Sequence, residues 1–457
     1  MRKTFILIII LAIGAFAYYK IAQRFVHGGD MPLPVWIESD SAEAIRNRTL
    51  ADFNLTQGEV LAQINERHPE VDEAMLDSFA ENKYVECMTV DGEKRYFRKT
   101  ARNLELLNPA YSGGTSPRGG MASDARISYV DSVLDFYAGT NPEGLAHEVV
   151  YRFSIDVSGH VDIIGDTLRV WMPVPMETAR QHDFAIISSS PETYVLSEGR
   201  TSHNSIYFEA MAPAAGDTAH FEYSARFVTS GAYTSAADIE KNIKPYNTAT
   251  DDYRRFTAFD NPHIVRLDSL ASAIVGNETS PFRRSEMVYD YIVSNYPWAG
   301  AREYSTIPCI PEYVIEQRHG DCGQVALLYI SLMRTLGIPA RWESGWMLHP
   351  GELNLHDWAE VYFEGVGWLP VDVSFGRYSS ASREEARTFY SHGIDGHRFA
   401  VNNGIGGEFY PPKRYVRSET VDFQVGEVEC SKGNLYYPAW NYRMELLDVK
   451  PVKIEDR

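Results

Sequence analysis

The feature that most constrains this chain is a predicted helix that begins at a cysteine. Residues 322–336 carry apolar side chains at helical spacing, and Gly337 and Pro339 are placed to cap and end the helix. Unpaired backbone N–H groups and the positive end of the helix dipole stabilise a thiolate or an oxyanion in a first turn. Cys322 is therefore a candidate nucleophile. The alternative is an inert buried thiol, which is the usual fate of a lone cysteine.

Two strand-like segments follow this helix and carry the partners that a nucleophilic cysteine needs. Residues 355–363 alternate in polarity and include His356, and residues 367–373 include Asp372. A hairpin with its loop at 363–365 would place His356 directly opposite Asp372. A shift by one residue would send Asp372 to the other face of the sheet, so the site depends on this register.

The order and spacing of these elements resemble the transglutaminase-like superfamily of papain-type cysteine enzymes. The likeness covers residues 287–376 and is carried by Gly320-x-Cys322, Leu336-Gly337-Ile338-Pro339-Ala340-Arg341, His356-x-Trp358-x-Glu360-Val361-Tyr362 and Gly367-Trp368-x-Pro370-Val371-Asp372. The resemblance implies an α+β fold in which the helix bearing the cysteine packs on an antiparallel sheet bearing the histidine and the aspartate. It also implies a triad: Cys322 attacks a carbonyl carbon, His356 moves the thiol proton, and Asp372 orients His356.

Triad chemistry of this kind proceeds through a thioester acyl-enzyme, which either water or an amine resolves. We expect a peptidase- or amidase-type hydrolase, with a protein-glutamine transamidase or deamidase as the alternative. An inactive binding module is the third interpretation, against which the intact triad argues. The expected substrate is a protein, a peptide or a cell-wall peptide. The backbone N–H of Cys322 is one expected oxyanion donor, and the second is Gln317, Tyr304 or Trp298.

The remaining sequence predicts modules on both sides of this core. Residues 83–98 read as two short strands joined by an Asp91-Gly92 turn, within a mainly helical region. Short strands between residues 147 and 233 predict a β-sandwich, and bacterial members of the superfamily are similar in placing a β-rich domain before the core. The predicted division is 1–25 signal peptide or membrane anchor, 26–140 mainly helical region, 141–235 β-sandwich, 236–400 transglutaminase-like core and 401–457 β-rich extension of the core.

The amino terminus indicates export. Arg2 and Lys3 precede an apolar run over residues 5–19, which is shorter than the roughly 18 residues of a membrane-spanning helix. Ala15-Phe16-Ala17 has the pattern of a signal-peptidase site. We expect a periplasmic or cell-surface protein with a cleaved signal. The alternative is an uncleaved anchor, which would give an association with the membrane.

Composition excludes several other classes. The 457 residues carry a net charge of −19 without a basic cluster, which argues against a nucleic-acid partner. The four cysteines are too dispersed for a disulfide framework or a structural zinc site. His319-x-x-Cys322 offers only two ligands, and we expect neither a metal nor a cofactor. His392 and His397 follow the core in a Gly-containing loop, and the expectation for both is a position on the surface.

Overall fold

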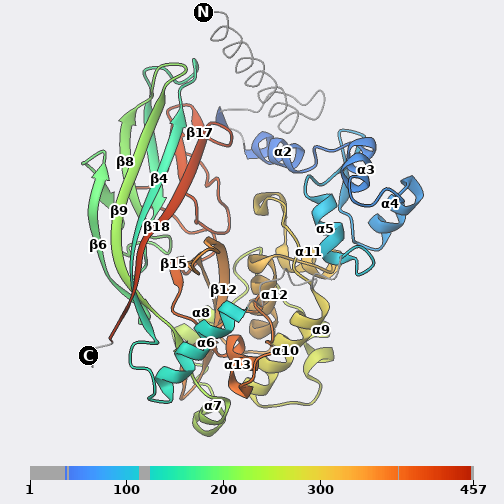
Figure 1. Cartoon of the computed structure of the whole chain (residues 1–457), viewed down its shortest axis with the longest axis vertical. Coiled ribbons are helices and arrows are strands. Elements are labelled where there is room, and N and C mark those ends of the chain that lie inside the picture. Colours follow the sequence, from blue (N-terminus) through green and yellow to red (C-terminus); the bar gives the residue numbers. More distant parts are fainter. Residues whose placement is uncertain (1–36, 39–40, 113–123, 379, 454–457) are drawn as a thin grey trace, which may run out of the picture.

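The chain has the predicted α+β fold, in which a sandwich of two sheets stands beside a smaller sheet covered by helices (Figure 1). The computed structural model describes residues 37–38, 41–112, 124–378 and 380–453. The predicted signal peptide or anchor over residues 1–25 lies outside these residues. Within the described ranges, none of the helices has both the length and the apolar character needed to cross a membrane.

The sandwich pairs a four-stranded sheet with a six-stranded sheet. The strand orders are β18-β4-β9-β6 and β1-β17-β16-β5-β8-β7, and every neighbouring pair is antiparallel. Alternate residues of the long strands, such as Tyr151 and Phe153, are buried in a shared apolar core. The strands are β1 (Ile37–Glu38), β4 (Ala146–Ser158), β5 (Thr167–Pro173), β6 (Gln181–Ser190), β7 (Val195–Leu196), β8 (Ser205–Met211), β9 (Thr218–Ser230), β16 (Glu427–Cys430), β17 (Gly433–Leu435) and β18 (Trp440–Val452).

The C-terminal strands differ from the prediction, which assigned residues 401–457 to an extension of the core. They belong to the sandwich instead. Strand β18 pairs with β4 from Trp440 opposite Val157 to Val452 opposite Ala146, and β16 pairs with β5. The physical reason is that β9 satisfies only one edge of β4, so the other edge needs a strand to pair its backbone groups. This strand comes from the far end of the chain, which local sequence patterns do not reveal.

The core sheet has the order β13-β12-β11-β15 and is also antiparallel. Its strands are β11 (Ala340–Met347), β12 (Asn354–Phe363), β13 (Gly367–Val371) and β15 (Arg398–Asn402). One face is covered by α12 (Cys322–Thr335), which begins at Cys322 as predicted, and around it pack α9 (Asp268–Val275), α10 (Pro281–Asn295) and α11 (Ile310–Gln317). Leu327 and Leu328 are fully buried in the resulting apolar cluster. The packing of α12 therefore fixes the position of its first residue, Cys322.

The β12–β13 hairpin has a different register from the predicted one. Phe363 pairs with Gly367, so the loop is residues 364–366, one residue later than expected. Gly365 and Gly367 both have positive φ, of 85° and 110°, and these left-handed positions fix the turn. Moving the loop by one residue shifts the pairing of the two strands by two residues, so every side chain stays on its expected face. His356 and Asp372 therefore still share a face, but they meet diagonally rather than directly opposite.

The N-terminal region is mainly helical, with the predicted hairpin confirmed. Asp91 and Gly92 both have positive φ and join strands in which Val90 pairs with Glu93. The region docks on the core through Asn103, whose amide exchanges two hydrogen bonds of 3.0 and 2.9 Å with the backbone of Gly300. The elements are α2 (Ser41–Asp52), α3 (Gln57–Asn65), α4 (Glu73–Glu81), β2 (Cys87–Val90), β3 (Glu93–Tyr96) and α5 (Thr100–Leu107).

Shorter elements complete the fold beside the core sheet. Helix α6 (Asp124–Tyr137) lies against α13 (Glu384–Thr388), below the core sheet in Figure 1. The remaining elements are β10 (Ala232–Tyr233), which pairs with β14 (Gly393–Ile394), helices α7 (Ala236–Asn242) and α8 (Asp251–Phe256), and the 3-10 turns η1 (Tyr304–Thr306) and η2 (Phe389–Ser391).

Candidate active site

Cys322 is the first residue of α12, and the residue before it caps the helix. The Asp321 side chain accepts a 3.1 Å hydrogen bond from the Gln324 backbone N–H, and the Gln324 side chain accepts one of 3.1 Å from the Asp321 backbone N–H. This reciprocal capping box fixes the first turn. Cys322 is partly buried, and its backbone N–H is one of the groups that the helix itself leaves unpaired.

The Cys322 thiol contacts Asp357, which sequence analysis did not single out. Sγ donates to Asp357 Oδ2 at 3.5 Å, and Gln424 Nε2 donates to Asp357 Oδ1 at 2.7 Å. Burial raises the pKa of the thiol well above its ordinary value, and the carboxyls of Asp357 and Asp321 raise it further. Burial also raises the pKa of Asp357 itself. The resting cysteine is therefore a neutral thiol.

His356 and Asp372 form a buried pair. Nε2 of His356 lies 2.7 Å from Asp372 Oδ2, and Arg398 Nη1 donates to the same oxygen at 3.0 Å. Ser374 Oγ donates to the other oxygen, Oδ1, at 2.8 Å. Burial alone would raise the pKa of Asp372, but the charges of His356 and Arg398 outweigh it and hold this pKa at about 2. Asp372 is thus a carboxylate at every physiological pH.

His356 is neutral in this environment. Burial lowers its pKa, and the attraction of Asp372 offsets only part of that effect, while Arg398 opposes it. Because Nε2 faces the carboxylate, that nitrogen carries the hydrogen and Nδ1 keeps its lone pair. Phe375 packs on the imidazole, with ring centroids 4.7 Å apart, and fixes its orientation.

His356 and Asp372 of the expected triad are therefore in hydrogen-bonding contact, whereas Cys322 contacts the opposite face of β12 through Asp357. Successive residues of β12 point to opposite faces, so Asp357 is the one that reaches the thiol. Among the described residues there is no hydrogen bond between Cys322 and His356. The charge of Asp372 nevertheless contributes to the raised pKa of the thiol.

Of the expected oxyanion donors, Tyr304 lies against the first turn of α12. Its hydroxyl donates to Asp321 Oδ1 at 2.5 Å, and a Cβ added at Gly323 would come within 2.4 Å of the Tyr304 hydroxyl oxygen. Trp298 approaches through its backbone, in an isolated bridge with Gly320. Gln317 ends α11 and makes no side-chain hydrogen bond with the described part of the chain. Tyr304 is thus the candidate whose polar group is at the site.

The polar side chains at the site that sequence analysis missed include Asp357, Arg398 and Gln424. A carboxyl at the position of Asp357 breaks the apolar side of an alternating strand, and that irregularity was a usable signal. Arg398 and Gln424 come from β15 and from the segment before β16, far along the chain, and no local pattern marks them.

Other expectations were also tested. His392 and His397 were expected on the surface, but both are buried, because each directly precedes a short strand, β14 or β15, that lies in the interior. All four cysteines are free thiols. His319 is buried, and burial lowers its pKa to about 4.

Residues 268–373 match the family model described as the transglutaminase-like superfamily. This range contains Cys322, His356 and Asp372, and it covers helices α9 to α12 and strands β11, β12 and β13 of the core. The predicted superfamily is thereby confirmed for the core.

Two curated relatives share part of this chain. Protein YebA of Bacillus subtilis, described as uncharacterized, is 28% identical over 159 residues, which cover 30% of this chain and 21% of YebA. An uncharacterized protein of Haemophilus influenzae is 26% identical over 173 residues, which cover 31% of this chain and 42% of the relative. The chain therefore spans less than half the length of either relative.

Solved structures give partial matches. A suggested cysteine protease from Cytophaga hutchinsonii matches with a TM-score of 0.44 and 16% identity, over 68% of this chain and 94% of that one. The periplasmic domain of TgpA from Pseudomonas aeruginosa, bound to ethylmercury, matches with a TM-score of 0.23 and 14% identity, over 52% of this chain and 93% of that one.

Proposed function

We propose that this chain, whose core over residues 268–373 is transglutaminase-like, is an exported thiol hydrolase that cleaves amide bonds through a thioester at Cys322. The observation that carries the proposal is the buried His356–Asp372 pair, in a core where the residue after His356, Asp357, contacts a cysteine at a helix amino terminus. A carboxylate-oriented imidazole and a thiol at unpaired backbone N–H groups are the parts that acyl transfer requires.

Each residue has one task in the proposed reaction. Nδ1 of His356 takes the thiol proton while Sγ of Cys322 bonds to the carbonyl carbon of the substrate. The carbonyl oxygen becomes an oxyanion, which the backbone N–H of Cys322 stabilises. When the tetrahedral intermediate collapses, the C–N bond breaks and the imidazolium returns the proton to the leaving amine. Water, deprotonated by His356, then attacks the thioester and releases the acid and the thiol.

The electrostatics favour proton transfer during attack over a preformed ion pair. Burial raises the pKa of the Cys322 thiol and lowers the pKa of His356, so both groups are neutral at rest. The thiol must also leave Asp357 and turn toward His356 Nδ1. Catalytic hydrogen bonds are often long or poorly aligned before substrate binds and tighten in the Michaelis complex. We therefore assign this exchange of partners to substrate binding.

Export rests on the N-terminal sequence, since the run over residues 5–19 with its preceding Arg2 and Lys3 is typical of a signal peptide. A periplasmic or cell-surface position gives the enzyme access to protein, peptide or cell-wall peptide substrates. Sequencing the amino terminus of the mature protein tests this part, because cleavage after Ala17 would leave Tyr18 as the first residue.

The test of activity compares the wild type with Cys322→Ala by mass spectrometry, on a mixture of protein and cell-wall peptides with and without a primary amine. The proposal predicts cleaved or deamidated products that need Cys322 and ignore the amine. Cys309→Ala is the matched control, since Cys309 is also a partly buried free thiol next to a helix. Amine-tagged glutamine would establish the transamidase. No product with either acceptor would favour the binding module.

A further inference from the structure

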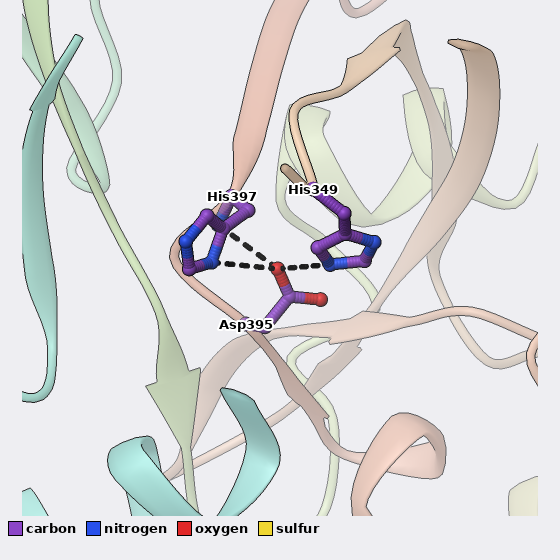
Figure 2. Close-up of side chains that lie close together, drawn as sticks. All are labelled: His349, Asp395 and His397. Atoms are coloured by element: carbon purple, nitrogen blue, oxygen red, sulfur yellow. Dashed lines mark hydrogen bonds and ion pairs between the residues drawn. The ribbon is translucent and has the colours of Figure 1, made fainter. Parts of the chain in front are cut away.

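Two histidines and an aspartate meet in the interior, outside the proposed triad. His349 follows β11, whereas Asp395 and His397 lie in the turn between β14 and β15, and Figure 2 shows all three converging. His349 Nε2 lies 3.0 Å from Asp395 Oδ1, and His397 Nδ1 lies 3.8 Å from the same oxygen. One potential ligand atom from each residue lies within 4.8 Å of the others. All three residues are buried.

The His397 side chain supplies the second observation. It is 7% exposed, and its Nδ1 points at Asp395 Oδ1 without a hydrogen-bond partner in the described part of the chain. A buried polar atom that lacks a partner costs about 1–3 kcal/mol, so an unfilled position of this kind calls for an explanation.

We infer that His349, Asp395 and His397 form a binding site for a borderline divalent cation, with Zn²⁺ as its best match. Zn²⁺ takes imidazole nitrogen and carboxylate oxygen at about 2.0–2.2 Å in tetrahedral geometry, which separates neighbouring ligand atoms by roughly 3.3 Å. The observed separations of 3.0 and 3.8 Å bracket this value. Mg²⁺ and Ca²⁺ prefer oxygen ligands throughout, so the two imidazoles select against them.

The surroundings supply outer contacts for such an ion. The second oxygen of Asp395, Oδ2, accepts from Arg398 Nη2 at 2.9 Å and from the Tyr390 hydroxyl at 2.8 Å, which holds the carboxylate in place. Tyr129 stacks on His349, with centroids 4.9 Å apart and ring planes at 9°. Carboxylates and aromatic rings that fix the ligands in this way are typical of metal sites.

A route to the site also exists. A cavity of about 360 Å³ is lined by Tyr129, His147 and His397, together with the loop at Asn141 and Glu143. It reaches one ligand directly, so a cation can enter there, and a water can complete the coordination from the same side. The His147 ring lies 4.4 Å from the ring of His397, centroid to centroid. This site is separate from the His319–Cys322 pair that sequence analysis considered.

The experiment measures metal binding and needs no enzymatic activity, so its failure is distinct from failure of the proposed function. The full chain carrying Cys322→Ala is stripped with a chelator and titrated with Zn²⁺ by calorimetry, so that the thiol cannot act as a ligand. We expect one equivalent of bound zinc. His349→Ala and His397→Ala should each weaken binding by at least about 100-fold, since even outer contacts of a metal site contribute 10–100-fold. His220→Ala is the control, an imidazole that is exposed on β9.

Co²⁺ provides a second measurement that does not depend on how the variants fold. In the Cys322→Ala protein it should give visible d–d bands of a nitrogen- and oxygen-ligated ion of low coordination number, and Zn²⁺ should displace it. The absence of stoichiometric zinc and of these bands would overturn the inference. Zinc binding that is unchanged in both histidine variants, with folded protein by circular dichroism, would overturn it equally.

Discussion

Replacing Asp372 by asparagine separates the charge of this side chain from its role in orienting His356. Oδ2 of Asp372 accepts from His356 and from Arg398, while Oδ1 accepts from Ser374. An amide with its oxygen in the Oδ2 position keeps both bonds, and its NH₂ group can donate to the Ser374 hydroxyl. The flipped amide is disfavoured, because its NH₂ group would face the Arg398 guanidinium and two hydrogen-bond donors would then point at each other. Asp372→Asn should therefore keep the ring in place with Nδ1 free.

What the substitution removes is the carboxylate that stabilises the imidazolium formed during attack. A hydrogen bond to a charged group contributes about 1.5–3 kcal/mol, compared with about 1 for a neutral one. If this difference of about 0.5–2 kcal/mol appears in full in the transition state, kcat/KM falls by about 2- to 30-fold, at 1.36 kcal/mol per factor of ten. Asp372→Ala also leaves Arg398 without that partner and removes the group that fixes the tautomer of His356, so its loss should approach the roughly 10⁴-fold of a triad whose histidine has the wrong tautomer.

The assay is release of nitrophenolate from a p-nitrophenyl ester, which reports thioester formation whatever the natural substrate is. Asp290→Asn is the control, because that carboxyl forms only a partly exposed ion pair with Arg377. Equal losses for the asparagine and alanine variants would refute the argument from orientation. An asparagine variant as active as the wild type would refute the role of the charge.

Three further predictions follow from the same geometry. Burial lowers the pKa of His356 below its ordinary value of 6.5, so its base form persists into mild acid. The acidic limb of kcat/KM against pH should therefore lie below 6.5, and a limb above 6.5 would contradict the assignment of His356 as the base. Gly323→Ala should lower activity by about 10²-fold, since the added Cβ would come 2.6 Å from Asp357 Oδ2. Gly58→Ala is the control and should leave activity unchanged, because Gly58 is also the second residue of a helix and its added Cβ would meet nothing within 4 Å. Arg398→Met should lower the free energy of unfolding by about 3–5 kcal/mol in urea titrations, because it removes the cationic partner of the buried carboxylates of Asp372 and Asp395. The exposed Arg443→Met should lower it by less than about 1 kcal/mol.

The sequence was sufficient where the determining contacts are local. The apolar stripe and the capping glycine predicted α12 with its start at Cys322, and Asp91-Gly92 predicted the β2–β3 hairpin. It was less reliable at the β12–β13 turn, where glycines at 365 and 367 allow neighbouring three-residue loops that differ little in local energy. It failed to place β18, because β18 pairs with β4, which lies far earlier in the chain, and no local sequence pattern identifies such a distant partner.

The same long-range pairing explains why the thiol environment was unpredictable. The segment that leads into β16 carries Gln424, whose amide donates both to Asp357 Oδ1 and, at 3.1 Å, to the carbonyl oxygen of His356. Trp346 of β11 in turn donates to the Gln424 carbonyl at 2.9 Å. One side chain from the sandwich-forming part of the chain therefore holds both the residue that contacts the thiol and the strand that carries the base. The position of the proposed base thus depends on the sandwich being complete, since β16 is fixed by its pairing with β5.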